Sequence, residues 1–326
     1  MGDEKNFRSQ FYGKVGLLEV EEKRAIEALL RETPLNGKEF SNFARRSIVP
    51  VAYKNLVWKL MLGITPRYAE SQDYVTQQQA YTFEELWCAL KALRLTNISL
   101  GIDGMNGHET YIVADSRKVN TGTKTHPETP YPEHHVLMWL MSEAKLLYNP
   151  RQQLMSKENQ HFISIARKVS SFFDNPVEIY HVCSALWALI LKNQASIVDA
   201  VQEAIGVLRK EHDVYHLHLL KAGLFSSSLL FDHCFCLFCD IFPESAIEKI
   251  LDKVIAKAFR ILSFVTVALL VHLRRSIASV YSVEGIRSLM CQIRKEEADV
   301  IVTAALELWA ITQSGFPRTQ RLTSVT

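Results

Sequence analysis

Apolar residues recur three and four positions apart along most of this chain, and this spacing constrains the fold more than any other feature. In 82–95, TFEELWCALKALRL, Leu86, Leu90 and Leu93 fall on one helical face. The same pattern recurs in the segments 195–210, 244–259 and 296–312. No run alternates apolar and polar residues between turn dipeptides, as a half-buried strand would. The sequence therefore predicts an all-α chain, a globular array of many short helices.

Three signals locate individual helices. Thr82 and Glu85 have the spacing of a capping box, so a helix is expected to begin there. Asn175 followed by Pro176 predicts another helix start, with an N-cap residue and a proline at the first helical position. The longest apolar run, 261–271, has eleven residues, whereas a membrane-spanning helix needs about 20. We therefore expect a buried core helix there, and no transmembrane segment.

One stretch departs from the helical pattern. Residues 99–135 contain many glycine, asparagine, threonine, proline and histidine residues and few apolar ones, so a long loop is predicted. Residues 1–19 are expected to form an N-terminal extension and 316–326 a disordered tail. Between them, 20–315 is predicted to form the main domain, with 99–135 inserted as a loop.

Charge and composition exclude several classes of function. The net charge is +2, and the basic residues form scattered pairs instead of one stripe, so no nucleic-acid partner is expected. The chain has no glycine-rich phosphate loop and no nucleophile elbow, so no cofactor is predicted. The start of the sequence lacks an apolar signal region. These features predict a cytoplasmic protein whose six cysteines stay reduced.

The segment HCFCLFC, residues 233–239, raises the question of a metal site. On a helix Cys234 and Cys236 lie about 200° apart and so face opposite ways. Cys236 and Cys239 share a face, but a zinc motif needs a tight turn and a second pair of ligands. The histidines of 211–218, EHDVYHLH, also lack an obvious third ligand. Buried free cysteines behave as small apolar residues, so a helical core segment is predicted, and no metal site.

Two blocks resemble a known family. The block 48–63, IVPVAYKNLVWKLMLG, resembles the opening signature of TBC domains, the Rab GTPase-activating fold, and the block from 233 onward is similar to their closing helices. The resemblance implies two helical subdomains, with HCFCLFC as the penultimate helix. The residues that fit the structural motif are Pro50, Lys54, Val57, Trp58, Leu62, Gly63, Phe238, Pro243 and Asp252. Lys54 stands where arginine is usual, and His233 and Leu251 stand where tryptophan is usual.

The resemblance also supplies the candidate catalytic residues. A TBC activator uses an arginine from Ile-x-x-Asp-x-x-Arg, and such a residue supplies roughly 10³–10⁵ in rate. In IVADSRK, Lys118 holds that position and Arg117 lies one residue early, and lysine lacks the planar fork of arginine. A second motif, Tyr-x-Gln-Gly-Met, positions water, and Gln160 holds its glutamine position. His161 replaces the glycine that permits close backbone approach. The candidates Arg117, Lys118 and Gln160 thus lie in degenerate motifs, which favours a non-catalytic chain.

The segment 6–32 resembles the TBC subfamily that includes the third subunit of the tuberous sclerosis complex. The resemblance implies a scaffold that binds a hamartin-like coiled coil in an apolar groove and supports the hamartin–tuberin complex. That complex activates the GTPase Rheb and negatively regulates TOR signalling. The alternatives are an active Rab activator in vesicle traffic, using Arg117 or Lys118 with Gln160, and a plain helical adaptor. The expected location is the cytoplasm, with peripheral attachment to lysosomal or vesicle membranes through partners.

Overall fold

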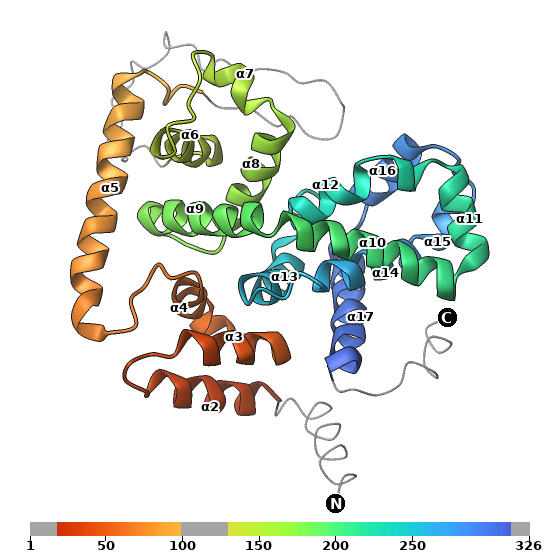
Figure 1. Cartoon of the computed structure of the whole chain (residues 1–326), viewed down its shortest axis with the longest axis horizontal. Helices are drawn as coiled ribbons and strands as arrows, with labels where there is room; N and C mark the ends of the chain where they lie inside the picture. Colours follow the sequence, from red (N-terminus) through yellow and green to blue (C-terminus); the bar gives the residue numbers. More distant parts are fainter. Residues whose placement is uncertain (1–17, 99–129, 314–326) are drawn as a thin grey trace, which may run out of the picture. The chain divides into compact units, whose positions relative to one another are not determined.

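The computed structural model describes residues 18–98 and 130–313 (Figure 1). Within these residues all regular structure is helical, with sixteen α-helices and two short 3-10 helices. The all-α prediction is therefore confirmed. The helices divide into two compact units: unit 1 combines the residues up to Gly63 with those from Ile190 onward, and unit 2 contains Ile64–Leu189.

The helices of unit 1 come from both ends of the chain. They are α2 (Leu18–Leu30), α3 (Gly37–Arg46), α4 (Val51–Met61), α10 (Gln194–Glu211), α11 (Asp213–Lys221), η2 (Leu224–Ser226), α12 (Leu229–Phe235), α13 (Glu244–Ile255), α14 (Ile261–His272), α15 (Arg274–Ile277), α16 (Val283–Cys291) and α17 (Lys295–Gln313). Those of unit 2 are η1 (Ala69–Ser71), α5 (Gln72–Ala92), α6 (Pro132–Ser142), α7 (Pro150–Leu154), α8 (Lys157–Val169) and most of α9 (Pro176–Lys192).

The two predicted helix starts have opposite outcomes. The side-chain oxygen of Asn175 accepts a hydrogen bond from the backbone N–H of Val177 at 2.9 Å, so the N-cap is confirmed. The start at Thr82 is wrong, because α5 begins ten residues earlier, at Gln72. Thr82 lies inside the helix, where its hydroxyl donates to the carbonyl of Gln78 at 3.0 Å. The preceding segment is too polar to show helical periodicity, which is why its helix was missed.

Unit 1 is organised around α14. All ten residues from Ile261 to Leu270 are buried, because α10 and α17 both pack against this helix. The buried hydroxyl of Thr266 donates to the carbonyl of Leu262 at 2.7 Å, so it is satisfied within the helix. The expectation of a buried core helix is confirmed. None of the helices in the described residues is long and apolar enough to cross a membrane.

The core of unit 2 is aromatic. Phe162 of α8 stacks on Trp187 of α9, with ring centroids 4.7 Å apart and planes 6° apart. Trp139 of α6 meets both rings edge-on, with its centroid 5.6 Å from that of Phe162 and 6.5 Å from that of Trp187. Aromatic pairs of this geometry add about 0.5–1.5 kcal/mol beyond the burial of their area. This cluster joins three helices of unit 2.

The predicted loop 99–135 is too long at its C-terminal end. Helix α6 begins at Pro132, so the last four residues of the predicted loop are helical. His134 and His135 are buried there, and burial with the neighbouring His134 lowers the pKa of His135 to about 3. Histidine is polar enough to suggest a loop, which explains the error. Residues 99–129, like 1–17 and 314–326, lie outside the described residues, so the proposed domain limits stay predictions.

The segment HCFCLFC is not one helix. Helix α12 ends at Phe235, and the next residues form a turn in which Leu237 and Phe238 have φ angles of 56° and 59°. Five further helices, α13 to α17, follow it, so it is not the penultimate helix. Its three cysteines are buried. This break could not be predicted from the residue types, because leucine and phenylalanine rarely adopt left-handed backbone angles.

Candidate functional site

The two candidate cations of the arginine motif, Arg117 and Lys118, lie outside the described residues. The candidate glutamine, Gln160, lies in the first turn of α8 and is half-buried. Its amide nitrogen donates to the backbone carbonyl of Leu154 at 2.7 Å. Asn159 makes a parallel contact, from its amide nitrogen to the carbonyl of Gln153 at 2.7 Å.

These two amides join α7 to α8. The carbonyls of Gln153 and Leu154 lie at the C-terminal end of α7, where an α-helix leaves carbonyl groups without intrahelical donors. Gln160 supplies one such donor, and releasing it would cost about 1 kcal/mol. The side chain at the expected water-positioning site therefore has a structural contact of its own.

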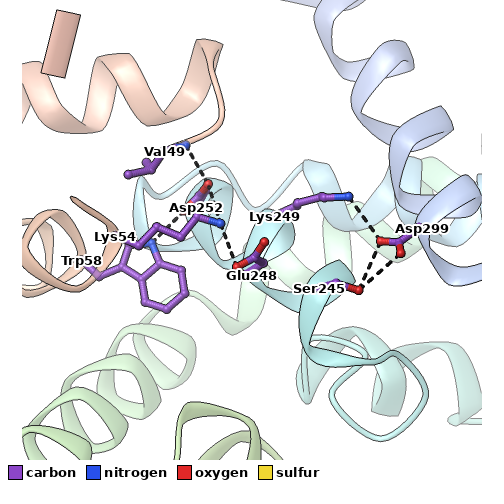
Figure 2. A network of polar contacts seen from close by, with 8 residues as sticks. All are labelled: Val49, Lys54, Trp58, Ser245, Glu248, Lys249, Asp252 and Asp299. Carbon is purple, nitrogen blue, oxygen red and sulfur yellow. Dashed lines mark hydrogen bonds and ion pairs between the residues drawn. The ribbon is translucent and has the colours of Figure 1, made fainter. Parts of the chain in front are cut away.

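Three motif residues do meet in unit 1, around the carboxylate of Asp252 on α13. Trp58 of α4 donates its indole N–H to Oδ1 at 2.8 Å, and the backbone N–H of Val49 donates to Oδ2 at 2.9 Å. The ammonium of Lys54 lies 4.0 Å from Oδ2 and 3.1 Å from the carboxylate of Glu248 (Figure 2). The carboxylate thereby holds the segment before α4, and α4 itself, against α13.

Burial dominates the electrostatics of this cluster. Asp252 is fully buried, and desolvation raises its pKa to about 6, although Lys54 and the two N–H donors act in the opposite direction. The neighbouring Lys253 is also buried, and desolvation lowers its pKa to about 8. Its ammonium donates to the carbonyls of Ala44 and Ser47, both at 2.7 Å. The charged groups are therefore paired and hydrogen-bonded, as buried charges must be.

A second, more exposed set of contacts extends from α13 to α17 (Figure 2). Lys249 lies 3.3 Å from Oδ1 of Asp299, and the hydroxyl of Ser245 donates to both carboxylate oxygens at 3.3 and 3.4 Å. The side chains of Lys249 and Asp299 are 23% and 36% exposed. Pairs this exposed contribute little to stability. The cluster as a whole organises the helices and presents no reacting group.

The remaining motif residues have conformational roles. Pro50 and Pro243 lie immediately before the first residues of α4 and α13. Gly63 follows α4 with a φ angle of +76°, a left-handed conformation that favours glycine after a helix end. Phe238 lies in the turn after α12 and stacks on Phe242, with centroids 5.5 Å apart. These positions fix where helices begin and end.

The turn after α12 also forms a polar cluster. Nδ1 of His233 lies 2.7 Å from Oδ2 of Asp240, and Sγ of Cys236 donates to Oδ1 of the same carboxylate at 3.0 Å. Burial raises the pKa of the Cys236 thiol, and the nearby charge of Asp240 adds to this effect. Among the residues that the structure describes, these three form one group whose ligand atoms could hold a metal ion.

Comparisons with known proteins extend over nearly the whole chain. No family model matches. TBC1 domain family member 7 of Danio rerio is 28% identical over 312 residues, which cover 94% of this chain and 95% of the relative. The protein of the same name from Homo sapiens is 27% identical over 312 residues, covering 94% of each chain. The chain is therefore similar to a TBC-domain protein over nearly its whole length.

The fold comparison agrees. The crystal structure of the Ypt/Rab-GAP domain of Gyp1p aligns with a TM-score of 0.58 and 12% identity, covering 90% of this chain and 99% of that domain. This chain therefore shares the fold of a Rab-GAP domain, and an identity that low carries the fold alone.

Helix α5 exposes much of its surface among the residues that the structure describes. It is 21 residues long, and its buried residues are Phe83, Trp87 and Leu90, all in its second half. Tyr74 and Tyr81 are each 66% exposed. They lie seven residues apart and therefore on one face of the helix. This face was not predicted from the sequence, because the capping-box spacing at Thr82 indicated a later helix start.

Unit 1 has a small hollow formed by α10, η2 and α12. Its volume is about 120 Å³, and its lining includes Val198, Ile205, Leu224 and Phe231. An engineered cavity of about 150 Å³ holds benzene, so this hollow has room for one apolar side chain. It is too small to receive a whole helix.

Proposed function

We propose that this chain is a non-catalytic TBC-domain scaffold that binds a hamartin-like coiled coil and supports a hamartin–tuberin assembly. Its contribution to TOR signalling is then indirect, through the Rheb-activating subunit of that assembly. The relatives named TBC1 domain family member 7 support the proposal by their similarity over 94% of the chain.

The observation that carries the non-catalytic part is the contact made by Gln160. Its amide donates at 2.7 Å to a helix-end carbonyl within its own unit. A glutamine that positions water must present its amide to the nucleotide of a partner GTPase, and here that would break the α7–α8 contact. Glu158 and His161 replace the tyrosine and glycine of the motif, and Lys118 replaces its arginine. A lysine cannot supply the planar fork that stabilises the transferring phosphoryl group.

We infer that the partner helix docks along α5. From Gln72 to Thr82 this helix has no buried residue in the described structure. Gln79 contacts Ile64 and His181, but the side of the helix that carries Tyr74 and Tyr81 is largely exposed. Most helical stability in proteins comes from packing of a face, so a long exposed helix is suited to pairing with another. Tyr74, Tyr81 and the exposed Cys88 follow at intervals of seven residues, the spacing at which helices meet in coiled coils.

The chemistry of this face fits a specific complex. Tyrosines contribute large, rigid contact areas with few rotatable bonds, and they are enriched among the residues that dominate binding energy. The polar residues near them along the helix, Gln77, Gln78, Glu84 and Glu85, are exposed and keep this surface soluble when no partner is bound.

The test is binding of a recombinant hamartin coiled-coil segment, measured by titration calorimetry. The double variant Tyr74→Asp, Tyr81→Asp should weaken binding by at least about 100-fold, since loss of a dominant residue costs 2 kcal/mol or more. Tyr148→Asp is the matched control, because Tyr148 is likewise an exposed tyrosine of unit 2 but lies outside α5. Bound coiled coil should also slow alkylation of Cys88.

Two outcomes would contradict the proposal in different ways. If the double variant and the control bound the coiled coil with equal affinity, the docking surface would not be α5. Absence of coiled-coil binding by the folded chain, together with nucleotide-dependent binding to a Rab protein, would favour the alternative of a Rab activator.

A further inference from the structure

The turn after α12 places a nitrogen, a sulfur and an oxygen ligand beside one another. Nδ1 of His233, Sγ of Cys236 and a carboxylate oxygen of Asp240 all lie within 4.8 Å of each other. His233 and Cys236 are 2% and 1% exposed, whereas the side chain of Asp240 is 38% exposed. The cluster is therefore closed on the protein side and open to solvent at the carboxylate.

The break in the helix creates this arrangement. Seven residues of a continuous α-helix rise about 10 Å, so Asp240 could not reach His233 if the helix continued. After Phe235 the chain turns through left-handed residues at Leu237 and Phe238. Each such residue costs roughly 1–2 kcal/mol when it has a Cβ atom. The turn returns the carboxylate to hydrogen-bonding distance, 2.7 Å, from the imidazole.

We propose that this turn is a zinc site, in which His233, Cys236 and Asp240 bind one Zn²⁺ and water completes a tetrahedron from the exposed side. The donor set identifies the ion, because imidazole and thiolate suit Zn²⁺, whereas Ca²⁺ and Mg²⁺ take oxygen ligands. The site is independent of the proposed scaffold role, since it lies in unit 1 and α5 lies in unit 2.

Zinc would replace the hydrogen bonds that now join the ligands. Zinc–ligand distances of about 2.0–2.3 Å place tetrahedral ligand atoms roughly 3.3–3.7 Å apart. Nδ1 now lies 2.7 Å from Oδ2 and Sγ lies 3.0 Å from Oδ1, so each of these two pairs must separate by less than about 1 Å. All three ligand atoms already lie within 4.8 Å of one another.

Zinc binding displaces a proton from each of two ligand atoms. The thiol of Cys236 gives up its proton to solvent when the S–Zn bond forms. The proton on Nδ1 of the neutral imidazole moves to Nε2 as Nδ1 takes the metal. One proton is therefore released for each zinc ion bound.

The experiment is a Co²⁺ titration of the full chain, because tetrahedral cobalt bound to thiolate has visible d–d bands and a sulfur-to-cobalt charge-transfer band. The expected result is saturation at one equivalent, displacement by Zn²⁺, and release of one proton to an indicator dye. Cys236→Ser should abolish the charge-transfer band, and Asp240→Asn should weaken binding by at least about tenfold. Cys234→Ser should change neither, because Sγ of Cys234 lies 3.3 Å from the hydroxyl of Thr266 and belongs to the core.

Either of two results would overturn the site. The first is a folded wild-type chain that shows no charge-transfer band at saturating Co²⁺. The second is a band that persists in Cys236→Ser, which would place the metal on another cysteine. The wild-type titration decides the question even if a variant fails to fold, which circular dichroism would reveal.

Discussion

Replacing Asp252 by alanine should destabilise the protein by about 3–5 kcal/mol. The carboxylate is fully buried and accepts hydrogen bonds from Trp58 at 2.8 Å and from the backbone of Val49 at 2.9 Å. Hydrogen bonds to a charged group contribute about 1.5–3 kcal/mol each, which gives about 3–6 kcal/mol for the two. The ion pair with Lys54 adds less, because the Lys54 ammonium keeps its closer partner, Glu248 at 3.1 Å, when Asp252 is removed.

Urea denaturation followed by tryptophan fluorescence would measure this loss, and Trp58 reports directly on the site. Asp299→Ala is the matched control, since it removes a carboxylate of the same cluster that is 36% exposed and whose contacts are 3.3–3.4 Å long. The control should lose less than about 1 kcal/mol. If both variants lost the same amount, the buried carboxylate would not be what holds α4 to α13, and the reasoning would be refuted.

Three further predictions concern pH, reactivity and Gln160. Because burial raises the pKa of Asp252 to about 6, the folded state binds this proton more tightly than the unfolded chain, whose ordinary value is about 4. The stability of wild type relative to Asp252→Ala should therefore be about 2 kcal/mol greater at pH 4 than at pH 7. Urea denaturation of both proteins at both pH values would measure this. If the stability difference between the two proteins were the same at pH 4 and pH 7, the raised pKa would be contradicted. Iodoacetamide should label the exposed Cys88 in the native protein but not Cys183, whose pKa is raised by burial, and mass spectrometry would detect any exception. Gln160→Ala should lower the free energy of unfolding by about 1 kcal/mol, and no loss would mean that its contact with Leu154 is unimportant.

The fold class could be predicted from sequence because apolar spacing reports which residues face a core. The spacing identified α10, α13 and α17, and the length of the apolar run identified α14 as a core helix. Apolar spacing failed to identify helical segments that are rich in polar residues. The first ten residues of α5 bury nothing, so they carry no periodic signal, and the buried His134 and His135 of α6 resembled loop residues.

The sites were harder to predict, because they depend on contacts between distant segments. The motif residues Lys54, Trp58 and Asp252 could be named from the family resemblance, but the donor from Val49 is a backbone group and leaves no mark in the sequence. The cluster of His233 and Asp240 depends on left-handed residues in the turn between them. Neither leucine nor phenylalanine favours such backbone angles, so a continuous helix was expected there.

The most direct test of the non-catalytic account is single-turnover GTP hydrolysis by a panel of Rab proteins and Rheb. The folded wild-type chain would be compared with a variant carrying Arg117→Ala, Lys118→Ala and Gln160→Ala. We predict that both proteins leave every intrinsic hydrolysis rate unchanged. Acceleration of any panel member by the wild type that disappears in the variant would contradict the account and establish a GTPase activator.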